Sequence, residues 1–200
     1  MGTTRDGGWH GLTFGSDGSR STDKLRELVL YVADKCEDDP TFGAVKLNKI
    51  LFYADFISFA EYGEPITGVK YKKFQQGPVP TILKRVRAEM EERGEVVVRK
   101  KSHYGRIQHR LIPLRQPDFG LLGARDIALV DDVIRMLWNR SAQEVSEISH
   151  DRAWRNASEG ETIPYEAAFI SDEPLTERDV AIAEEMIAEY ERFEQSAGRS

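Results

Sequence analysis

Residues 46–80 read KLNKILFYADFISFAEYGEPITGVKYKKFQQGPVP, and this stretch decides the fold. Its first half is apolar on nearly every side of a helix. One face carries Leu47, Ile50, Leu51, Ala54 and Ile57, and the next carries Phe52, Phe56 and Phe59. A helix with so little polar surface is usually buried in the middle of a domain. Gly63 predicts its end, because glycine adopts the left-handed conformation at low cost. The sequence therefore predicts a central helix over residues 44–62.

The segments next to this helix predict further short elements. An apolar stripe from Leu25 to Cys36 predicts a first helix that begins at a Ser21 or Thr22 cap. Residues 69–74 alternate as a strand does. Gly77-Pro78 then turns the chain into a helix over residues 80–93, with Pro80 in its first turn.

The second half predicts one hairpin and more helices. Residues 95–101 and 106–111 predict two strands around Gly105, and residues 113–124 predict a loop. Helices follow from Asp126, from a Ser141-x-x-Glu144 capping box, and from a Thr176-x-x-Asp179 cap. The fold class is therefore α+β and mostly helical: a single domain with a small antiparallel sheet or hairpin inserted between helices.

The composition predicts three parts of the chain. Residues 1–21 are rich in Gly, Ser, Thr and Asp and predict a flexible tail. Residues 22–170 carry the periodic segments and predict the domain. Residues 171–200 predict a C-terminal amphipathic helix and tail.

Composition and charge also limit the function. One cysteine, Cys36, forms no internal disulfide, and there is no apolar run of membrane-spanning length. The first residues of the sequence do not predict a signal peptide. A cytoplasmic protein that contacts no membrane is expected. Residues 65–115 hold 13 Lys or Arg and 4 Asp or Glu, a balance of +9, whereas the remainder holds 15 and 30, a balance of −15. A basic centre with acidic flanks is compatible with a nucleic-acid surface, an acidic protein partner or a solvated face.

No pattern predicts catalysis. The chain has no glycine-rich phosphate loop, no pair of cysteines at metal spacing and no Gly-x-Ser-x-Gly turn, and its four histidines are dispersed. We expect no enzyme activity, no catalytic residues, no bound metal and no cofactor.

Two blocks of sequence resemble a known family. The first is Lys46-Leu47-x-Lys49-Ile50-Leu51-x-Tyr53-Ala54-Asp55, followed by Gly68-x-x-Tyr71 and Gly77-Pro78-Val79. The second is Ser146-x-Ile148-Ser149-His150-x-x-x-Trp154, followed by Gly160 and Ile163-Pro164. Together they resemble the Panacea domain of the SocA-like antitoxins, over roughly residues 22–170.

The resemblance implies an antitoxin that binds and neutralises a cognate protein toxin by direct contact. In one relative the domain instead delivers its toxin to a cellular protease. Two alternatives are a DNA-binding transcriptional regulator and a phage-encoded accessory protein that uses the domain for another interaction.

The two blocks also suggest a partner-binding face. We expect it to combine residues of the central helix, the following turn and the second block: Lys46, Lys49, Asp55, Gln75, Gln76, Gly77, Pro78, His150 and Trp154. Lys46 and Lys49 lie near a helix start, where a positive charge is unfavourable, and this favours a contact with an acidic group. A structural role is the alternative for each of these residues, and it is favoured for His150 and Trp154.

The regulator alternative depends on the basic helix and hairpin of residues 80–112. Its candidate nucleic-acid contacts are Lys84, Arg87, Arg99, Lys100, Lys101 and Arg106. The acidic remainder of the chain repels phosphate at long range, so binding to a specific nucleic-acid sequence is not expected. Lysines that protect a strand edge from aggregation are the structural alternative.

Overall fold

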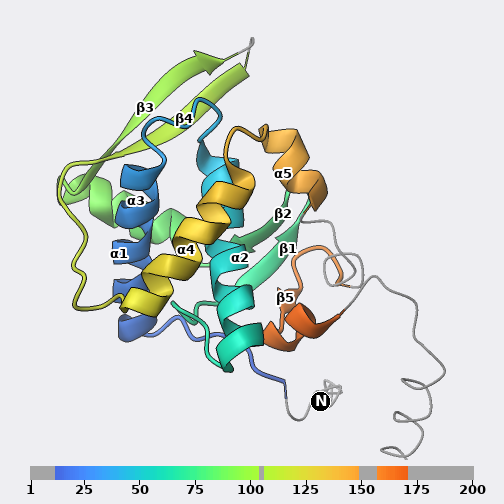
Figure 1. Cartoon of the computed structure of the whole chain (residues 1–200). Helices are drawn as coiled ribbons and strands as arrows, with labels where there is room; N and C mark the ends of the chain where they lie inside the picture. Colours follow the sequence, from blue (N-terminus) through green and yellow to red (C-terminus); the bar gives the residue numbers. More distant parts are fainter. Residues whose placement is uncertain (1–11, 104–105, 149–156, 171–200) are drawn as a thin grey trace, which may run out of the picture. The chain divides into compact units, whose positions relative to one another are not determined.

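A computed structural model describes residues 12–103, 106–148 and 157–170 of the chain (Figure 1). The chain divides into two units, residues 1–170 and 171–200, and every described element lies in the first. The helix predicted after Thr176, with the rest of residues 171–200, lies outside the described residues.

Helix α2 (Ala44–Tyr62) is the central element, as its sequence predicts. Helices α1 (Ser19–Lys35), α4 (Ala124–Leu137) and α5 (Ala142–Ile148) all contact it. Gly63 ends α2 with φ 74°, and its N–H donates to the Phe59 carbonyl over 2.8 Å. The predicted left-handed terminus is therefore confirmed.

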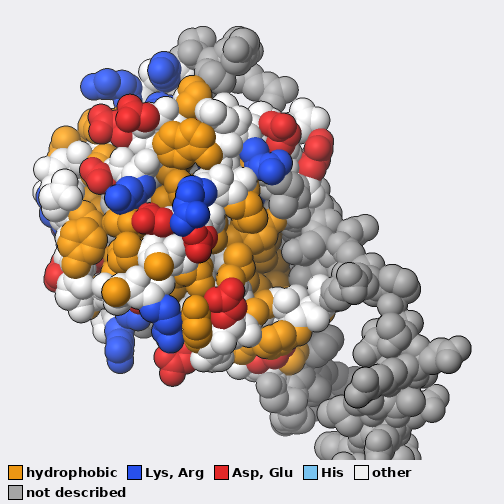
Figure 2. Space-filling view, viewed as in Figure 1, with side chains coloured by type: hydrophobic (Ala, Val, Ile, Leu, Met, Phe, Trp, Pro, Cys, Tyr) orange, Lys and Arg blue, Asp and Glu red, His pale blue; other side chains and the backbone are white. Residues whose placement is uncertain are grey.

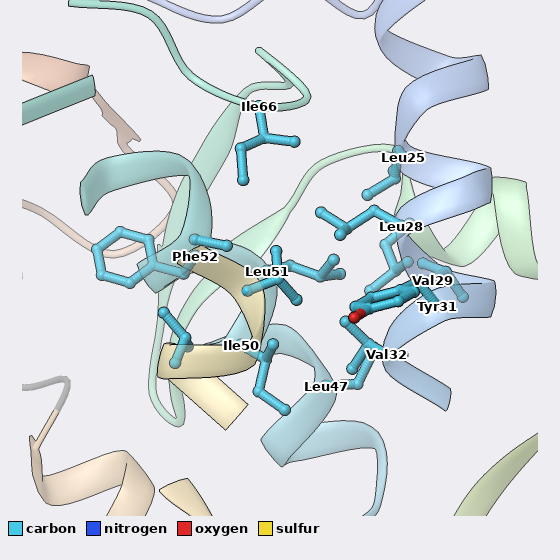
Figure 3. Packing of buried hydrophobic residues seen from close by; sticks show 14 of the residues in the cluster. Leu25, Leu28, Val29, Tyr31, Val32, Leu47, Ile50, Leu51, Phe52 and Ile66 are labelled. Carbon is cyan, nitrogen blue, oxygen red and sulfur yellow. The ribbon is translucent and has the colours of Figure 1, made fainter. Parts of the chain in front are cut away.

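The core lies where α1 faces α2. Figure 3 shows Leu25, Leu28 and Val32 of α1 pointing toward Leu47 and Leu51 of α2, and all five side chains are buried. Burying each such side chain contributes about 1.5–3 kcal/mol to stability. The α1–α2 contact is therefore a major source of the stability of the fold.

A three-stranded antiparallel sheet packs beside α2, with strand order β2-β1-β5. Strand β1 (Tyr71–Phe74) forms a hairpin with β2 (Gly77–Pro80), and β5 (Thr162–Ile163) pairs with the other edge of β1. The sequence predicts β1 but not β2, because Pro78 and Pro80 are typical of strand breaks. Both prolines are tolerated here because β2 is an edge strand. Helix α3 consequently begins at Leu83 and ends at Glu92, and Pro80 belongs to β2.

The second sheet is the predicted hairpin, formed by β3 (Val96–His103) and β4 (Arg106–Pro113). In Figure 1 it extends from the helices as a two-stranded ribbon. Val96 and Leu111 near its base are buried. The base thereby fixes the ribbon to α1 and α3.

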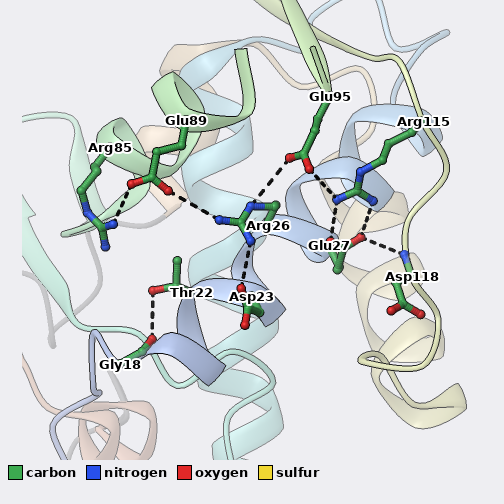
Figure 4. Close-up of polar contacts among 10 residues, drawn as sticks. All are labelled: Gly18, Thr22, Asp23, Arg26, Glu27, Arg85, Glu89, Glu95, Arg115 and Asp118. Atoms are coloured by element: carbon green, nitrogen blue, oxygen red, sulfur yellow. Dashed lines mark hydrogen bonds and ion pairs between the residues drawn. The ribbon is translucent and has the colours of Figure 1, made fainter. Parts of the chain in front are cut away.

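Ion pairs join α1 to α3, to Glu95 just before β3, and to the loop after β4 (Figure 4). Arg115 donates to both carboxylate oxygens of Glu27 over 2.7 Å, and the Asp118 N–H donates to the same carboxylate over 2.8 Å. Arg26 is 3.5 Å from Glu89 and 3.7 Å from Glu95. This network covers the side of α1 that faces away from α2.

The N-terminal segment is bound to the domain from residue 13 onward, so the expected tail over residues 1–21 is too long. Helix α1 starts at Ser19, with Gly18 as its N-cap. The Thr13 N–H donates to the Glu166 carboxylate over 2.8 and 2.9 Å, and the Ser16 N–H donates to the Gly68 carbonyl over 2.7 Å. A Cβ added to Gly15 would lie 2.2 Å from the Val69 carbonyl oxygen. The sequence did not predict this contact because hydrogen bonds hold the segment, and such bonds leave no apolar periodicity in the sequence.

The C-terminal end of the described chain completes the sheet and the core. The 3₁₀ helix η1 (Tyr165–Phe169) follows β5 directly, and neither element is predicted by the sequence. The Tyr165 ring lies 4.8 Å from Phe56 and 5.5 Å from Phe59, and its hydroxyl donates to the Val69 carbonyl over 2.7 Å. Two strand residues and one turn of 3₁₀ helix are too short for a periodic signal.

Candidate protein-binding site

Lys46 is 1% exposed and forms a buried ion pair at the start of α2. Its Nζ donates to the Asp39 carboxylate over 2.7 Å and also to the Thr41 hydroxyl. The N–H and hydroxyl of Thr41 donate to the same carboxylate over 2.9 and 2.8 Å. Burial lowers the pKa of Lys46, and the bond with Asp39 opposes this shift.

Arg110 of β4 extends this cluster to the hairpin. Its guanidinium donates to the carbonyls of Asp39 over 2.8 Å, Glu37 over 2.6 Å and Cys36 over 3.2 Å. These carbonyls follow the end of α1, so a side chain from a distant strand satisfies them. The cluster thereby fixes the loop between α1 and α2 against β4.

Lys49 is fully buried and holds the β1–β2 turn. Its Nζ donates to the Gln76 carbonyl, and the Ser146 hydroxyl of α5 donates to the same oxygen over 3.3 Å. The structure thus brings together the central helix, the turn and the start of the second sequence block, as expected from their shared family resemblance.

Asp55 is fully buried and organises the connection from α2 to β1. Its carboxylate accepts from the Thr67 N–H over 2.6 Å, from the Thr67 hydroxyl, and from the Tyr71 hydroxyl over 2.8 Å. Burial raises the pKa of Asp55, while the three donors lower it. Asp55 thus positions β1 relative to α2.

The expectation that Lys46, Lys49 and Asp55 present charge to a partner is therefore wrong for this structure. All three are at most 1% exposed and bonded within the chain. The sequence did not show this because their partners lie from 5 to 27 residues away in the chain. Gly77 and Pro78 are buried too, and Gly77 has φ 99°, which favours glycine. These five residues shape the face from beneath.

Gln75 and Gln76 are exposed at the tip of the β1–β2 turn, as a partner contact requires. They border an open groove of about 360 Å³ between the turn and the start of α2. We call it the turn groove, and its lining residues are Val45, Asn48, Phe74, Gln75, Gln76, Val79 and Glu159. The Phe74 side chain is 41% exposed there. The turn groove thus combines an exposed aromatic ring, a residue type enriched at protein interfaces, with three amide side chains and one carboxylate, Glu159.

A second hollow, of about 310 Å³, lies between α2 and α4. Tyr62 and Met136 line it and are 45% and 41% exposed, and Arg125 stacks 4.4 Å from the centre of the Tyr62 ring. Figure 2 shows hydrophobic side chains on the face that α4 and α2 occupy. This hollow is not lined by any of the residues that were predicted to contact a partner.

His150 and Trp154 lie outside the described residues, so their predicted role stays a prediction. Among the alternative nucleic-acid contacts, Lys84, Arg99, Lys100 and Lys101 are exposed and Arg87 is half-buried. Arg106 begins β4, and its side chain lies outside the described residues.

Sequence reasoning missed several residues that shape the site. Asp39 was overlooked because it lies in a run of acidic residues, and Arg110 because it lies in a basic strand. Charges in such segments are usually solvated. Thr67 and Tyr165 carry no local signal. A search for acceptors of the buried Lys46 and Lys49 would have pointed to Asp39, the only one of these four that lies near them in sequence.

Within residues 12–103, 106–148 and 157–170, no group of three or more His, Cys, Asp or Glu side chains is placed to hold a metal ion. No helix in that part of the chain has the length and apolar character to cross a membrane.

Comparison with known proteins agrees with the two sequence blocks. The family model described as "Antitoxin SocA-like, Panacea domain" matches residues 47–155, more than half of the 200-residue chain. No curated protein and no solved structure matches the chain. The matched range contains most of α2, both hairpins, α3, α4 and α5. The chain therefore belongs to the SocA-like antitoxin family and carries its Panacea domain.

Proposed function

We propose that this protein is an antitoxin that neutralises a cognate toxin by direct contact, without enzyme activity of its own. Family membership is the observation that carries the proposal. The single cysteine supports a cytoplasmic setting, where thiols stay reduced.

We propose further that the toxin binds at the turn groove. Support comes from the way in which two motif residues, the buried Lys49 and the half-buried Ser146, fix this exposed turn: both bond to the carbonyl of Gln76, whose side chain is exposed. A turn held from beneath loses little conformational freedom on binding, which favours affinity. Stable complexes bury about 800 Å² on each partner, so the contact would extend from the groove onto α2 and α5.

The test is co-expression with the product of the neighbouring gene, followed by growth measurement and pull-down. Wild-type antitoxin should restore growth and recover the toxin in stoichiometric amount. Gln76→Arg should reduce recovery at least tenfold, because it places a charge at the centre of the face. Gln116→Arg is the matched control, since Gln116 is also exposed but lies in the loop before α4.

Two outcomes would contradict the proposal. No recovery of toxin by the wild-type protein would refute direct binding. Equal recovery by the Gln76→Arg and Gln116→Arg variants would exclude the turn groove as the toxin-binding site, but it would not exclude direct binding elsewhere. Toxin half-life after translation arrest then separates two mechanisms, because delivery to a protease shortens it and simple blocking does not.

A further inference from the structure

The outer half of the β3–β4 hairpin carries positive charge that nothing in the described fold neutralises. Arg99, Lys100 and Lys101 are consecutive on β3 and exposed. No Asp or Glu occurs between Glu95 and Asp118. Ion pairs are recorded elsewhere in the described residues, at Arg26, Lys46, Arg85, Arg115, Arg125 and Arg135, but at none of these three.

The charges lie on both faces of the ribbon. Arg99 and Lys101 share one face, because side chains alternate along a strand, and they are about 7 Å apart at a rise of 3.4 Å per residue. Lys100 lies on the other face, directly opposite the exposed His109 of β4. In Figure 2, lysine and arginine side chains project from the end of the molecule that the hairpin occupies.

The ribbon is also held firmly at its base. Arg110 bonds to three carbonyls after α1, and Gln108 Nε2 donates to the Pro40 carbonyl over 3.2 Å. Arg99 lies opposite Arg110 in the register, and like charges in that position are destabilising. The hairpin therefore keeps a cation at a position where it lowers stability.

We propose that Arg99, Lys100 and Lys101 form a contact site for the phosphate backbone of duplex DNA, separate from the toxin-binding face. A two-stranded ribbon fits the major groove of B-form DNA, where phosphate rows run on either side of it. The long side chains of Arg99, Lys100 and Lys101 can reach from either face of the ribbon to these phosphate rows. Phosphate contacts carry no sequence information, so the binding is independent of sequence.

Acidic neighbours limit the site to the outer half of the hairpin. Glu37 and Asp38 are exposed beside the base, where Arg110 reaches the Glu37 carbonyl. With the net charge of −6, they place the affinity in the ordinary non-specific range, a dissociation constant of about 10⁻⁴–10⁻⁶ M at physiological salt.

The test is fluorescence anisotropy with labelled 20-base-pair duplex DNA of mixed sequence, from 50 to 200 mM salt. We compare the full chain with a triple variant, Arg99→Gln, Lys100→Gln and Lys101→Gln. Loss of three phosphate contacts should reduce the slope of log K against log salt by about 2.7, at roughly 0.9 per contact. It should also weaken binding at least tenfold at 50 mM salt.

The matched control removes three exposed arginines of the α4 region, as Arg125→Gln, Arg135→Gln and Arg140→Gln. It changes the net charge equally and should alter the affinity less than twofold. Circular dichroism and the thermal midpoint confirm that both variants fold. No binding by the wild type at 50 mM salt, or equal losses in both variants, would overturn the proposal.

Two further probes test the class of partner. A 20-base-pair RNA duplex should bind more weakly than DNA, because its deep, narrow major groove does not admit the ribbon. Poly-glutamate at equal charge should compete poorly, because it lacks the groove. Tighter binding to RNA, or equal competition by poly-glutamate, would refute a DNA-groove site. The assay contains no toxin, so its outcome is independent of the antitoxin proposal.

Discussion

Replacing Lys46 by methionine should destabilise the protein by about 3 kcal/mol, although the two side chains are similar in volume. The change removes the Nζ that lies 2.7 Å from the Asp39 carboxylate, in a pair of which both side chains are 1% exposed. A hydrogen bond to a charged group contributes about 1.5–3 kcal/mol, and breaking a buried ion pair costs about 3–5 kcal/mol. We expect the lower end, because Thr41 still donates twice to the carboxylate and Arg110 lies at the Asp39 carbonyl.

The assay is urea unfolding followed by circular dichroism. For a slope of about 2 kcal/mol per molar urea, the midpoint should fall by roughly 1.5 M. Lys84→Met is the matched control, since Lys84 is exposed, and it should change stability by less than about 0.5 kcal/mol. Combining Lys46→Met with Asp39→Asn should cost less than the sum of the two single changes, by at least about 1 kcal/mol. Strict additivity, or a loss below about 1 kcal/mol for Lys46→Met, would refute the reasoning.

Three further predictions follow from the fold. Gly15→Ala should lower the thermal midpoint by several degrees, because its Cβ would lie 2.2 Å from the Val69 carbonyl oxygen, whereas Gly18→Ala, with only the Ser16 side chain at 3.3 Å, should change it little. Leu51→Ala should reduce the free energy of unfolding by about 2–5 kcal/mol in the same urea assay, because Leu51 is fully buried between α1 and α2, and a near-neutral result would contradict this packing. Burial raises the pKa of Glu27, but the bonds from Arg115 and the Asp118 N–H outweigh burial and leave this pKa below 4.5. The ionised Glu27 carboxylate therefore stabilises the fold above pH 4.5, and this contribution is lost as the pH falls through the folded-state pKa. Glu27→Gln should therefore flatten the fall in thermal midpoint between about pH 5 and pH 3, and an unchanged acid profile would exclude this contribution.

Elements with strong periodicity could be predicted from the sequence. The apolar residues of α2 and its Gly63 terminus indicated a buried central helix, and the β3–β4 hairpin followed from two alternating runs around Gly105. The Ser141 capping box is also confirmed, since the Glu144 carboxylate accepts from the Ser141 N–H over 2.6 Å. Strand β2 was missed because Pro78 and Pro80 argue against a strand when the sequence alone is considered. The pairing with β1 shows that β2 is an edge strand, where proline is tolerated.

The candidate site was harder to predict, because its charged residues depend on distant partners. Lys46 and Lys49 look like solvated or partner-binding lysines in a helix, until Asp39 and the Gln76 carbonyl are placed beside them. A sequence pattern shows which residues share a helix face but not what lies opposite that face. Gln75 and Gln76 were predicted as partner contacts. Their exposure is compatible with that role, which stays a prediction.

The bonds between Thr13 and residues 165 and 166 have a consequence for how the protein is made. The Tyr165 N–H donates to the Thr13 carbonyl over 2.9 Å, and β5 supplies the third strand of the sheet, so the two ends of the described domain join only after about 150 intervening residues have been synthesised. Helices form from local contacts within microseconds, whereas closing so long a loop is late and slow. A ribosome-bound chain that ends before Glu161 therefore has α1 and α2 but lacks β5 and the Tyr165 ring that covers Phe56 and Phe59. We expect such nascent chains to be open to proteolysis, so that the supply of folded protein depends on how many chains are completed.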